Sequence, residues 1–144
     1  MSEEIRTRVY EFLKKYPFTI AFRLSAHMKV ISKHLNPGEE IIYLFPAQKE
    51  MGGPFSTCIV CCTNKRIMIA QKKVLPGYYL NSITPDLFND FQVKKGFVFG
   101  KVTIDTAKEV VHLTDLDPRS LPEVETNLSE YLLHEKPKIL NKHK

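Results

Sequence analysis

Three closely spaced cysteines are the residues in this sequence best suited to chemistry. Cys58, Cys61 and Cys62 could supply thiolates to a metal ion, and they lie in a run of β-branched and small apolar residues typical of a strand. Because side chains alternate between the two faces of a strand, Cys58 and Cys62 would share one face and Cys61 would lie on the other. The three sulfur atoms then cannot converge on one ion. We therefore expect reduced thiols buried in the core, with no metal ion and no other cofactor.

The histidines and acidic residues show no spacing that predicts catalysis. No histidine stands at a spacing typical of a zinc site or a Ser-His-Asp triad, and the sequence has no glycine-rich phosphate loop. Asp105 and Glu109 flank a predicted turn, where charged side chains are usually solvated. His112, in a predicted strand, and His134, near a helix end, are expected on the surface. The sequence therefore predicts neither enzymatic activity nor a small-molecule substrate.

The basic residues are the remaining candidates for binding. The net charge is +5, and residues 1–38 hold seven Lys or Arg against three Glu. Arg23, Lys29 and Lys33 in this segment, and Lys94 with Lys95 at a predicted hairpin, are candidate contacts for an anionic membrane or for phosphate groups. For the hairpin lysines we favour the alternative, which is that they serve solubility and protect sheet edges. No run of aromatic residues alternates with these cations, so we expect no nucleic-acid binding.

Two helices are predicted before residue 36. Apolar residues recur at helical spacing over residues 2–16 and again over residues 24–35, and a proline follows each stretch. The apolar stripes can pack on the chain's own strands, receive a protein partner, or lie on an anionic membrane, and the sequence leaves these alternatives open. Because they cannot all stay in water, they form a candidate association surface, made up of Ile5, Val9, Phe12, Leu24, Met28 and Ile31.

From residue 39 the sequence changes to β-branched and aromatic runs separated by turn residues, the pattern of an antiparallel meander. Asn64 predicts a two-residue hairpin in which it adopts a positive φ. Residues 94–96 predict a three-residue loop with Gly96 in the left-handed conformation, and Gly100 predicts a bulge or a sharp bend. The predicted strands are residues 40–50, 55–63, 66–72, 78–83, 88–93, 97–105 and 109–114.

A final helix is predicted over residues 120–136. Ser120 and Glu123 have the spacing of a capping box, and Pro122 falls in the first turn, where its missing N–H costs nothing. One apolar stripe, which we expect to cover the open end of the strands, is formed by Leu121, Val124, Leu128, Tyr131 and Leu132. Residues 137–144 are expected to form a basic tail.

Three local segments resemble the bacterial pleckstrin-homology (PH)-like domain family. They are CCTNKRIMIA (residues 61–70), VKKGFVFGKVTIDT (93–106) and LPEVETNLSEYLLHEK (121–136), and the resemblance covers residues 35–136. It implies a mainly β, α+β fold: a seven-stranded bent antiparallel barrel capped by a carboxy-terminal helix, here with an amino-terminal helical extension. It also implies a non-enzymatic binding or assembly module.

The sequence departs from the lipid-binding pattern of eukaryotic PH domains, which place several Lys or Arg around the loop between their first two strands. Here Lys49 stands beside Glu50, and no Lys or Arg follows until Lys65. We therefore do not expect specific binding of inositol phosphates.

These observations predict three parts: a helical extension (residues 1–35), a barrel that folds on its own (36–136) and a basic tail (137–144). The expected function is a binding or self-assembly module with a protein partner or a second copy of the chain as ligand. The alternative is a peripheral module that binds an anionic membrane through the helices and lysine hairpins. The first residues, MSEEIRTR, form no apolar signal region, and the apolar runs are too short to span a bilayer. We therefore expect a cytoplasmic location.

Overall fold

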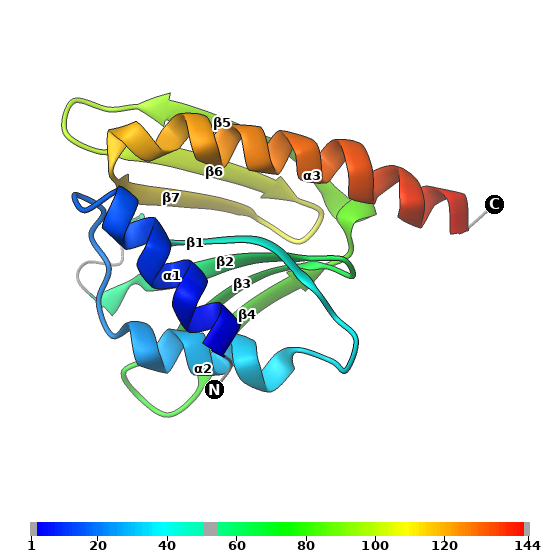
Figure 1. Ribbon diagram of the computed structural model, residues 1–144, viewed down its shortest axis with the longest axis horizontal. Coiled ribbons are helices and arrows are strands. Elements are labelled where there is room, and N and C mark those ends of the chain that lie inside the picture. Colours follow the sequence, from blue (N-terminus) through cyan, green and yellow to red (C-terminus); the bar gives the residue numbers. More distant parts are fainter. Residues whose placement is uncertain (1–2, 51–54, 143–144) are drawn as a thin grey trace.

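The computed structural model describes residues 3–50 and 55–142, with side chains described up to residue 138. Over this range, the chain forms two helices, a seven-stranded antiparallel sheet and a third helix (Figure 1). The elements are α1 (Glu3–Lys15), α2 (Leu24–His34), β1 (Ile41–Lys49), β2 (Thr57–Thr63), β3 (Ile67–Lys72), β4 (Tyr78–Ile83), η2 (Pro85–Leu87), β5 (Phe88–Lys95), β6 (Gly100–Thr106), β7 (Val110–Leu116), η3 (Pro118–Ser120) and α3 (Leu121–Lys142). The predicted fold class is confirmed.

The sheet is bent between β1 and β7. Its strand order is β4-β3-β2-β1-β7-β6-β5, so β4 and β5 are the edge strands. β1 pairs with β7 through only two residues, Gln48 and Lys49, whereas it pairs along most of its length with β2. Two side-chain hydrogen bonds join β4 to the β6–β7 turn. Lys108 Nζ donates to the Ser82 carbonyl at 2.8 Å, and Asn81 Nδ2 donates to Glu109 at 3.1 Å. The long helix α3 covers the β5 side (Figure 1).

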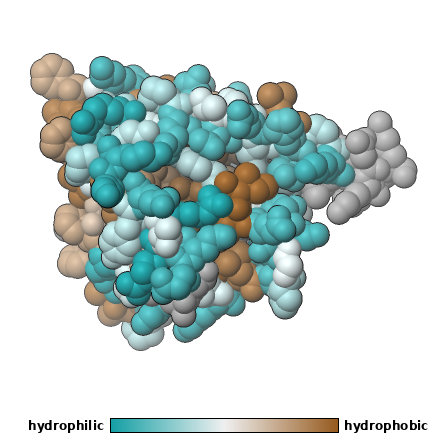
Figure 2. Space-filling view, in the orientation of Figure 1, coloured by the Kyte–Doolittle hydropathy of each residue, from teal (hydrophilic) through white to brown (hydrophobic). Residues whose placement is uncertain are grey.

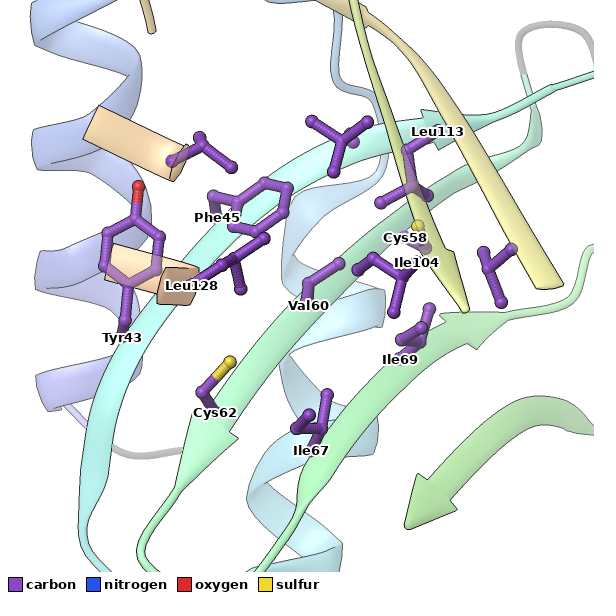
Figure 3. Packing of buried hydrophobic residues seen from close by; sticks show 14 of the residues in the cluster. Tyr43, Phe45, Cys58, Val60, Cys62, Ile67, Ile69, Ile104, Leu113 and Leu128 are labelled. Atoms are coloured by element: carbon purple, nitrogen blue, oxygen red, sulfur yellow. The ribbon is translucent and has the colours of Figure 1, made fainter. Parts of the chain in front are cut away.

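The inner face of the bent sheet packs on α3. Side chains of β1, β2 and β3 point toward Ile104 of β6, Leu113 of β7 and Leu128 of α3 (Figure 3). Cys58 and Cys62 belong to this cluster, while Cys61 belongs to the cluster on the opposite face, as the strand alternation predicted. Burial raises the pKa of Cys58 and of Cys61 to about 12, and that of Cys62 well above its ordinary value. All three groups are therefore thiols at neutral pH.

The outer face of β1–β3 is also apolar, and α1 and α2 cover it. Ile5 and Val9 of α1 and Met28 and Ile31 of α2 are fully buried against this face. Phe12 reaches the inner cluster, and Leu24 packs at the border of the outer one. Five of the six side chains of the candidate association surface are therefore buried in the chain's own core, and the sixth, Leu24, is partly buried at its border.

His27 joins α2 to the sheet. Its side chain is 1% exposed, and its Nδ1 accepts a hydrogen bond of 2.8 Å from the Lys72 N–H of β3. An accepting Nδ1 carries no proton, so the neutral ring is protonated at Nε2. Burial, assisted by the positive charge of Arg23, lowers the pKa of His27 to about 4. A neutral imidazole therefore fixes α2 to the end of β3 at physiological pH.

Two hairpins differ from their predicted form. Asn64 does not adopt a positive φ; instead, Thr63 Oγ1 accepts hydrogen bonds from the N–H groups of Lys65 and Arg66 and shapes the two-residue turn. The β5–β6 loop is residues 96–99, not 94–96, because the pairing of the two strands continues to Lys95 and Gly100. Gly96 has no positive φ either. Because the turn comes later than predicted, Phe97 and Val98 lie at an exposed loop tip and not in a strand.

The start of α3 also differs from its prediction. The Asp117 side chain accepts from the Arg119 N–H, and Ser120 Oγ donates to the Asp117 carbonyl, so Ser120 does not cap the helix. Glu123 does not reach back to the backbone but accepts bonds from Lys15, Tyr16 and Tyr43. Glu123 therefore ties α3 to α1 and β1.

The predicted basic tail is helical over most of its length, because α3 continues through Pro137 to Lys142. A proline inside a helix removes one backbone hydrogen bond and strains the preceding turn, but it does not force the chain out of the helix.

We predict that Gly100→Ala destabilises the protein by about 1–3 kcal/mol, the usual cost of overpacking. The register of β6 and β7 shifts between Gly100 and Val102, with the extra residue on β7, and a Cβ at Gly100 would lie 2.8–3.0 Å from Cδ2, Cγ and Cδ1 of Leu121. Denaturant unfolding of Gly100→Ala, Leu121→Ala and the double variant measures the coupling. Because Leu121→Ala removes the clashing atoms, the double variant should lose less free energy than the sum of the single losses. Additive losses would contradict the proposed close contact.

We predict that the free energy of unfolding falls by about 2 kcal/mol between pH 7 and pH 5 because of His27. Its pKa is lower in the folded state, about 4, than in the unfolded chain, so the unfolded state binds more protons and acid destabilises the fold. The other groups with lowered pKa values, Glu39, Glu123 and Asp117, titrate below this window. Urea unfolding of the unmodified chain and of His27→Gln at both pH values isolates the contribution. An equal pH dependence in the two proteins would argue against this assignment.

Candidate functional site

A groove of about 770 Å³ lies between α2 and the β3–β4 hairpin, with Tyr10 of α1 at one side. Its volume falls in the range of ordinary ligand sites, about 300–1,000 Å³. Its floor is apolar and includes Ala21, Leu24 and Val30. Since α2 is fixed to β3 by His27 and by its buried face, the groove is formed by elements that are rigidly joined.

The rim of the groove is basic. Arg23, Lys29 and Lys33 line it from α2 and the residue before it, and Lys72 lines it from the end of β3. No aspartate or glutamate is among the lining residues that the structure describes. Within the described chain none of these four cations forms an ion pair with a carboxylate, although six ion pairs form elsewhere. The groove is therefore an apolar surface under an uncompensated positive rim.

Two tyrosines flank the groove, and both are about half exposed: Tyr10 (47%) and Tyr78 (52%). The His34 ring meets the Tyr78 ring edge-on, with centroids 5.0 Å apart, and His34 Nε2 lies 3.2 Å from the Tyr78 hydroxyl. His34 Nδ1 lies 2.7 Å from the Val30 carbonyl, to which it donates. This chain of bonds holds Tyr78 of β4 beside α2 and fixes one wall of the groove.

Backbone geometry at the start of α2 is unusual. Arg23 has φ 53°, in the left-handed region that long side chains seldom occupy. Its guanidinium Nη1 donates to the Lys72 carbonyl at 3.3 Å, and Lys72 Nζ in turn donates to the Gly77 carbonyl at 3.0 Å. Arg23 and Lys72 therefore hold the β3–β4 hairpin against α2. Lys29 and Lys33, one helical turn apart and exposed, are the cations most available to a ligand.

The structure brings together three of the five cations that the sequence singled out. Lys94 and Lys95 lie on β5, in the other half of the sheet, where Lys95 shares a surface hollow with Pro118 and Arg119. Sequence reasoning missed Tyr10, Tyr78 and the role of Lys72, because only the folded chain places α1 and β3–β4 beside α2. The i,i+4 spacing of Lys29 and Lys33 was the one local signal.

Other candidate residues have clear positions. His112 and His134 are exposed, as predicted. The Lys49 ammonium lies 3.5 Å from the centroid of the Tyr79 ring, where it forms a cation–π contact. No group of three His, Cys, Asp or Glu suited to a metal ion occurs among the described residues. Within the same range, no helix is long and apolar enough to cross a membrane.

A solved structure of a pleckstrin homology domain shares this architecture. The crystal structure of a pleckstrin homology domain from Shewanella amazonensis SB2B aligns with a TM-score of 0.53 and 15% identity, over 73% of this chain and 94% of that one. A DUF1696 family protein with a pleckstrin-homology domain from Shewanella loihica PV-4 aligns with a TM-score of 0.47 and 9% identity, over 72% and 91% of the two chains. No curated protein matches the sequence.

The family comparison is more specific than the structural ones. The model of the bacterial PH domain family matches residues 35–129, which include all seven strands of the sheet and the first part of α3. The resemblance seen in the hairpins and in the final helix is thereby confirmed. This chain belongs to the bacterial PH domain family.

Proposed function

We propose that this chain is a non-enzymatic binding module that acts inside the cell, and that its α2 groove holds an acidic, partly apolar segment of a protein partner. The observation that carries the proposal is the groove itself, in which an apolar floor lies under four cations with no lining carboxylate among the described residues. A segment with both acidic and apolar side chains matches both properties. Its carboxylates would meet Lys29 and Lys33, and its apolar side chains would cover Leu24 and Val30.

The composition of the groove favours a protein segment. Tyrosine and arginine are enriched at protein–protein interfaces, where tyrosine offers a large rigid surface with a polar tip. Tyr10 and Tyr78 line the groove in a half-exposed state, and Arg23 lines it next to Lys72, whose carbonyl accepts from the Arg23 guanidinium. A bound segment would bury the exposed parts of both rings.

A catalytic role has no support from the reactive side chains. PH-like domains are generally non-enzymatic, and the cysteines of this chain are buried with raised pKa values. A thiol must ionise to act as a nucleophile, and these thiols do not at neutral pH.

If this chain binds a membrane, the contact surface would not be the two helices. A helix that lies on a membrane inserts its apolar face, but the apolar faces of α1 and α2 cover the sheet. Lys94 and Lys95 remain exposed, so a membrane role would rest on their end of the molecule.

Self-association through the apolar faces of the helices is not expected either, because these faces pack on the sheet. Light scattering of the full chain tests this directly, and we expect the mass of one chain.

We predict that the full chain binds a labelled acidic peptide with alternating Glu and Leu and that Lys29→Glu/Lys33→Glu weakens this binding by about tenfold or more, the equivalent of 1.4 kcal/mol. Reversing two rim charges replaces attraction with repulsion, and raised salt should weaken the binding to the unmodified chain through screening. Fluorescence anisotropy measures the dissociation constants, and circular dichroism verifies that the variants are folded.

The matched control is Lys65→Glu/Lys138→Glu, which makes the same change in net charge away from the groove. It should bind the peptide as the unmodified chain does, and a peptide with Lys in place of Glu should not bind. Equal losses in the two double variants would show a general charge effect and refute the groove as the site.

A further inference from the structure

One end of the molecule exposes six large apolar side chains on three separate segments. Phe18 and Phe22 lie in the α1–α2 connection, Val74 and Leu75 in the β3–β4 turn, and Phe97 and Val98 in the β5–β6 loop. Phe97 is fully exposed, and the exposure of Leu75 is 76%. Apolar atoms gather along the corresponding left edge of the molecule (Figure 2). We call this surface the loop end.

Contacts join the three segments. The Phe18 N–H donates to Asp117 at 3.2 Å, and the Arg119 guanidinium lies 4.9 Å from the centroid of the Phe18 ring. Arg119 and Lys95 line the same hollow, which connects the α1–α2 segment to the β5–β6 hairpin. On the other side, Lys72 Nζ donates to carbonyls of the β3–β4 turn, and its own carbonyl accepts from the Arg23 side chain. The three segments therefore lie at one end (Figure 1).

The loop end is also basic. Lys73 stands beside Val74 and Leu75, Lys94 and Lys95 precede the β5–β6 loop, and Arg119 lies against Phe18. Of the carboxylates near these segments, Asp117 is buried and paired with Arg119 at 2.6 Å, and Glu50 is paired with Lys101 at 3.3 Å. Glu125, which lines the hollow beside Lys95, and Asp115, whose carbonyl accepts from the Ile20 N–H, form no ion pair within the described chain. The three lysines have no carboxylate partner within the described chain.

We infer that the loop end docks on an anionic lipid bilayer, with Phe97 and Val98 entering the interface and the lysines contacting the headgroups. Exposed apolar patches mark either protein or membrane contacts, and here lysine decides between them. Lysine is depleted at protein interfaces, whereas near an anionic membrane each lysine adds attraction and its alkyl stem can lie in the interface. This inference is independent of the groove and of its ligand.

The absence of tryptophan from the sequence allows a clean test. Phe97→Trp introduces a single fluorophore at the loop tip, and Leu133→Trp places one on the exposed side of α3, away from the loop end. With phosphatidylcholine vesicles that contain phosphatidylserine, the emission of the Phe97→Trp variant should shift to the blue and be quenched by lipids brominated on the acyl chain. The emission of the Leu133→Trp variant should not change. Vesicles of phosphatidylcholine alone should produce no shift in either variant.

Sedimentation with the same vesicles tests the contribution of charge and of insertion. Phe97→Ser/Val98→Ser and Lys94→Glu/Lys95→Glu should each lower the partition coefficient onto phosphatidylserine vesicles by about tenfold. Leu133→Ser and Lys65→Glu/Lys138→Glu are the matched apolar and charge controls and should bind as the unmodified chain does. No binding to the anionic vesicles, equal blue shifts at positions 97 and 133, or equal losses in controls and loop-end variants would each overturn the inference. A stable dimer that the Phe97→Ser/Val98→Ser change dissociates would also overturn it, since the loop end would then be a protein interface.

Discussion

Every residue of β2 is buried, and the rest of the structure depends on this constraint. A strand that excludes water from both faces needs a cover on each side. The inner face of β2 meets β6, β7 and α3, and its outer face meets α1 and α2. The helices before residue 36 are therefore part of the same core as the strands. The expected division into an extension and a self-sufficient barrel separates elements that share this core.

The same constraint positions the groove. Because the buried stripe of α2 faces β3, its opposite side faces solvent with Lys29 and Lys33. His27 extends the buried stripe to the end of β3, where its ring accepts from the Lys72 N–H. The loss of this bond on protonation would act on the stability of the fold and on the shape of the groove together. The two proposed binding surfaces differ in kind, since the groove is concave and the loop end projects into solvent.

Much of the fold could be predicted from local patterns. Alternation and turn residues indicated the strands, and the largest shift, at the start of β6, arose because Phe97 is an aromatic residue with high strand propensity. Strand alternation correctly assigned the three cysteines to two faces of β2, but the sequence did not show that α1 and α2 cover the outer face. Glu123 shows why local patterns were not sufficient. Its spacing from Ser120 predicted a capping box, but its carboxylate accepts from side chains of distant segments, namely Lys15, Tyr16 and Tyr43. For the same reason, the sequence indicated the basic residues of α2 that line the groove but not Tyr10, Lys72 and Tyr78, which come from other elements.

The central claim is that α1 and α2 form one cooperative unit with the sheet. Native-state hydrogen exchange of the full chain tests it, because amides that open only by global unfolding share one free energy of exchange. We predict that the amides of Val30 and Ile31 in α2 exchange with the same free energy as those of Ile59 and Cys61 in β2. If the α2 amides exchange at a much lower free energy while β2 stays protected, the helices are a separable arm, and the claim of a shared core is contradicted.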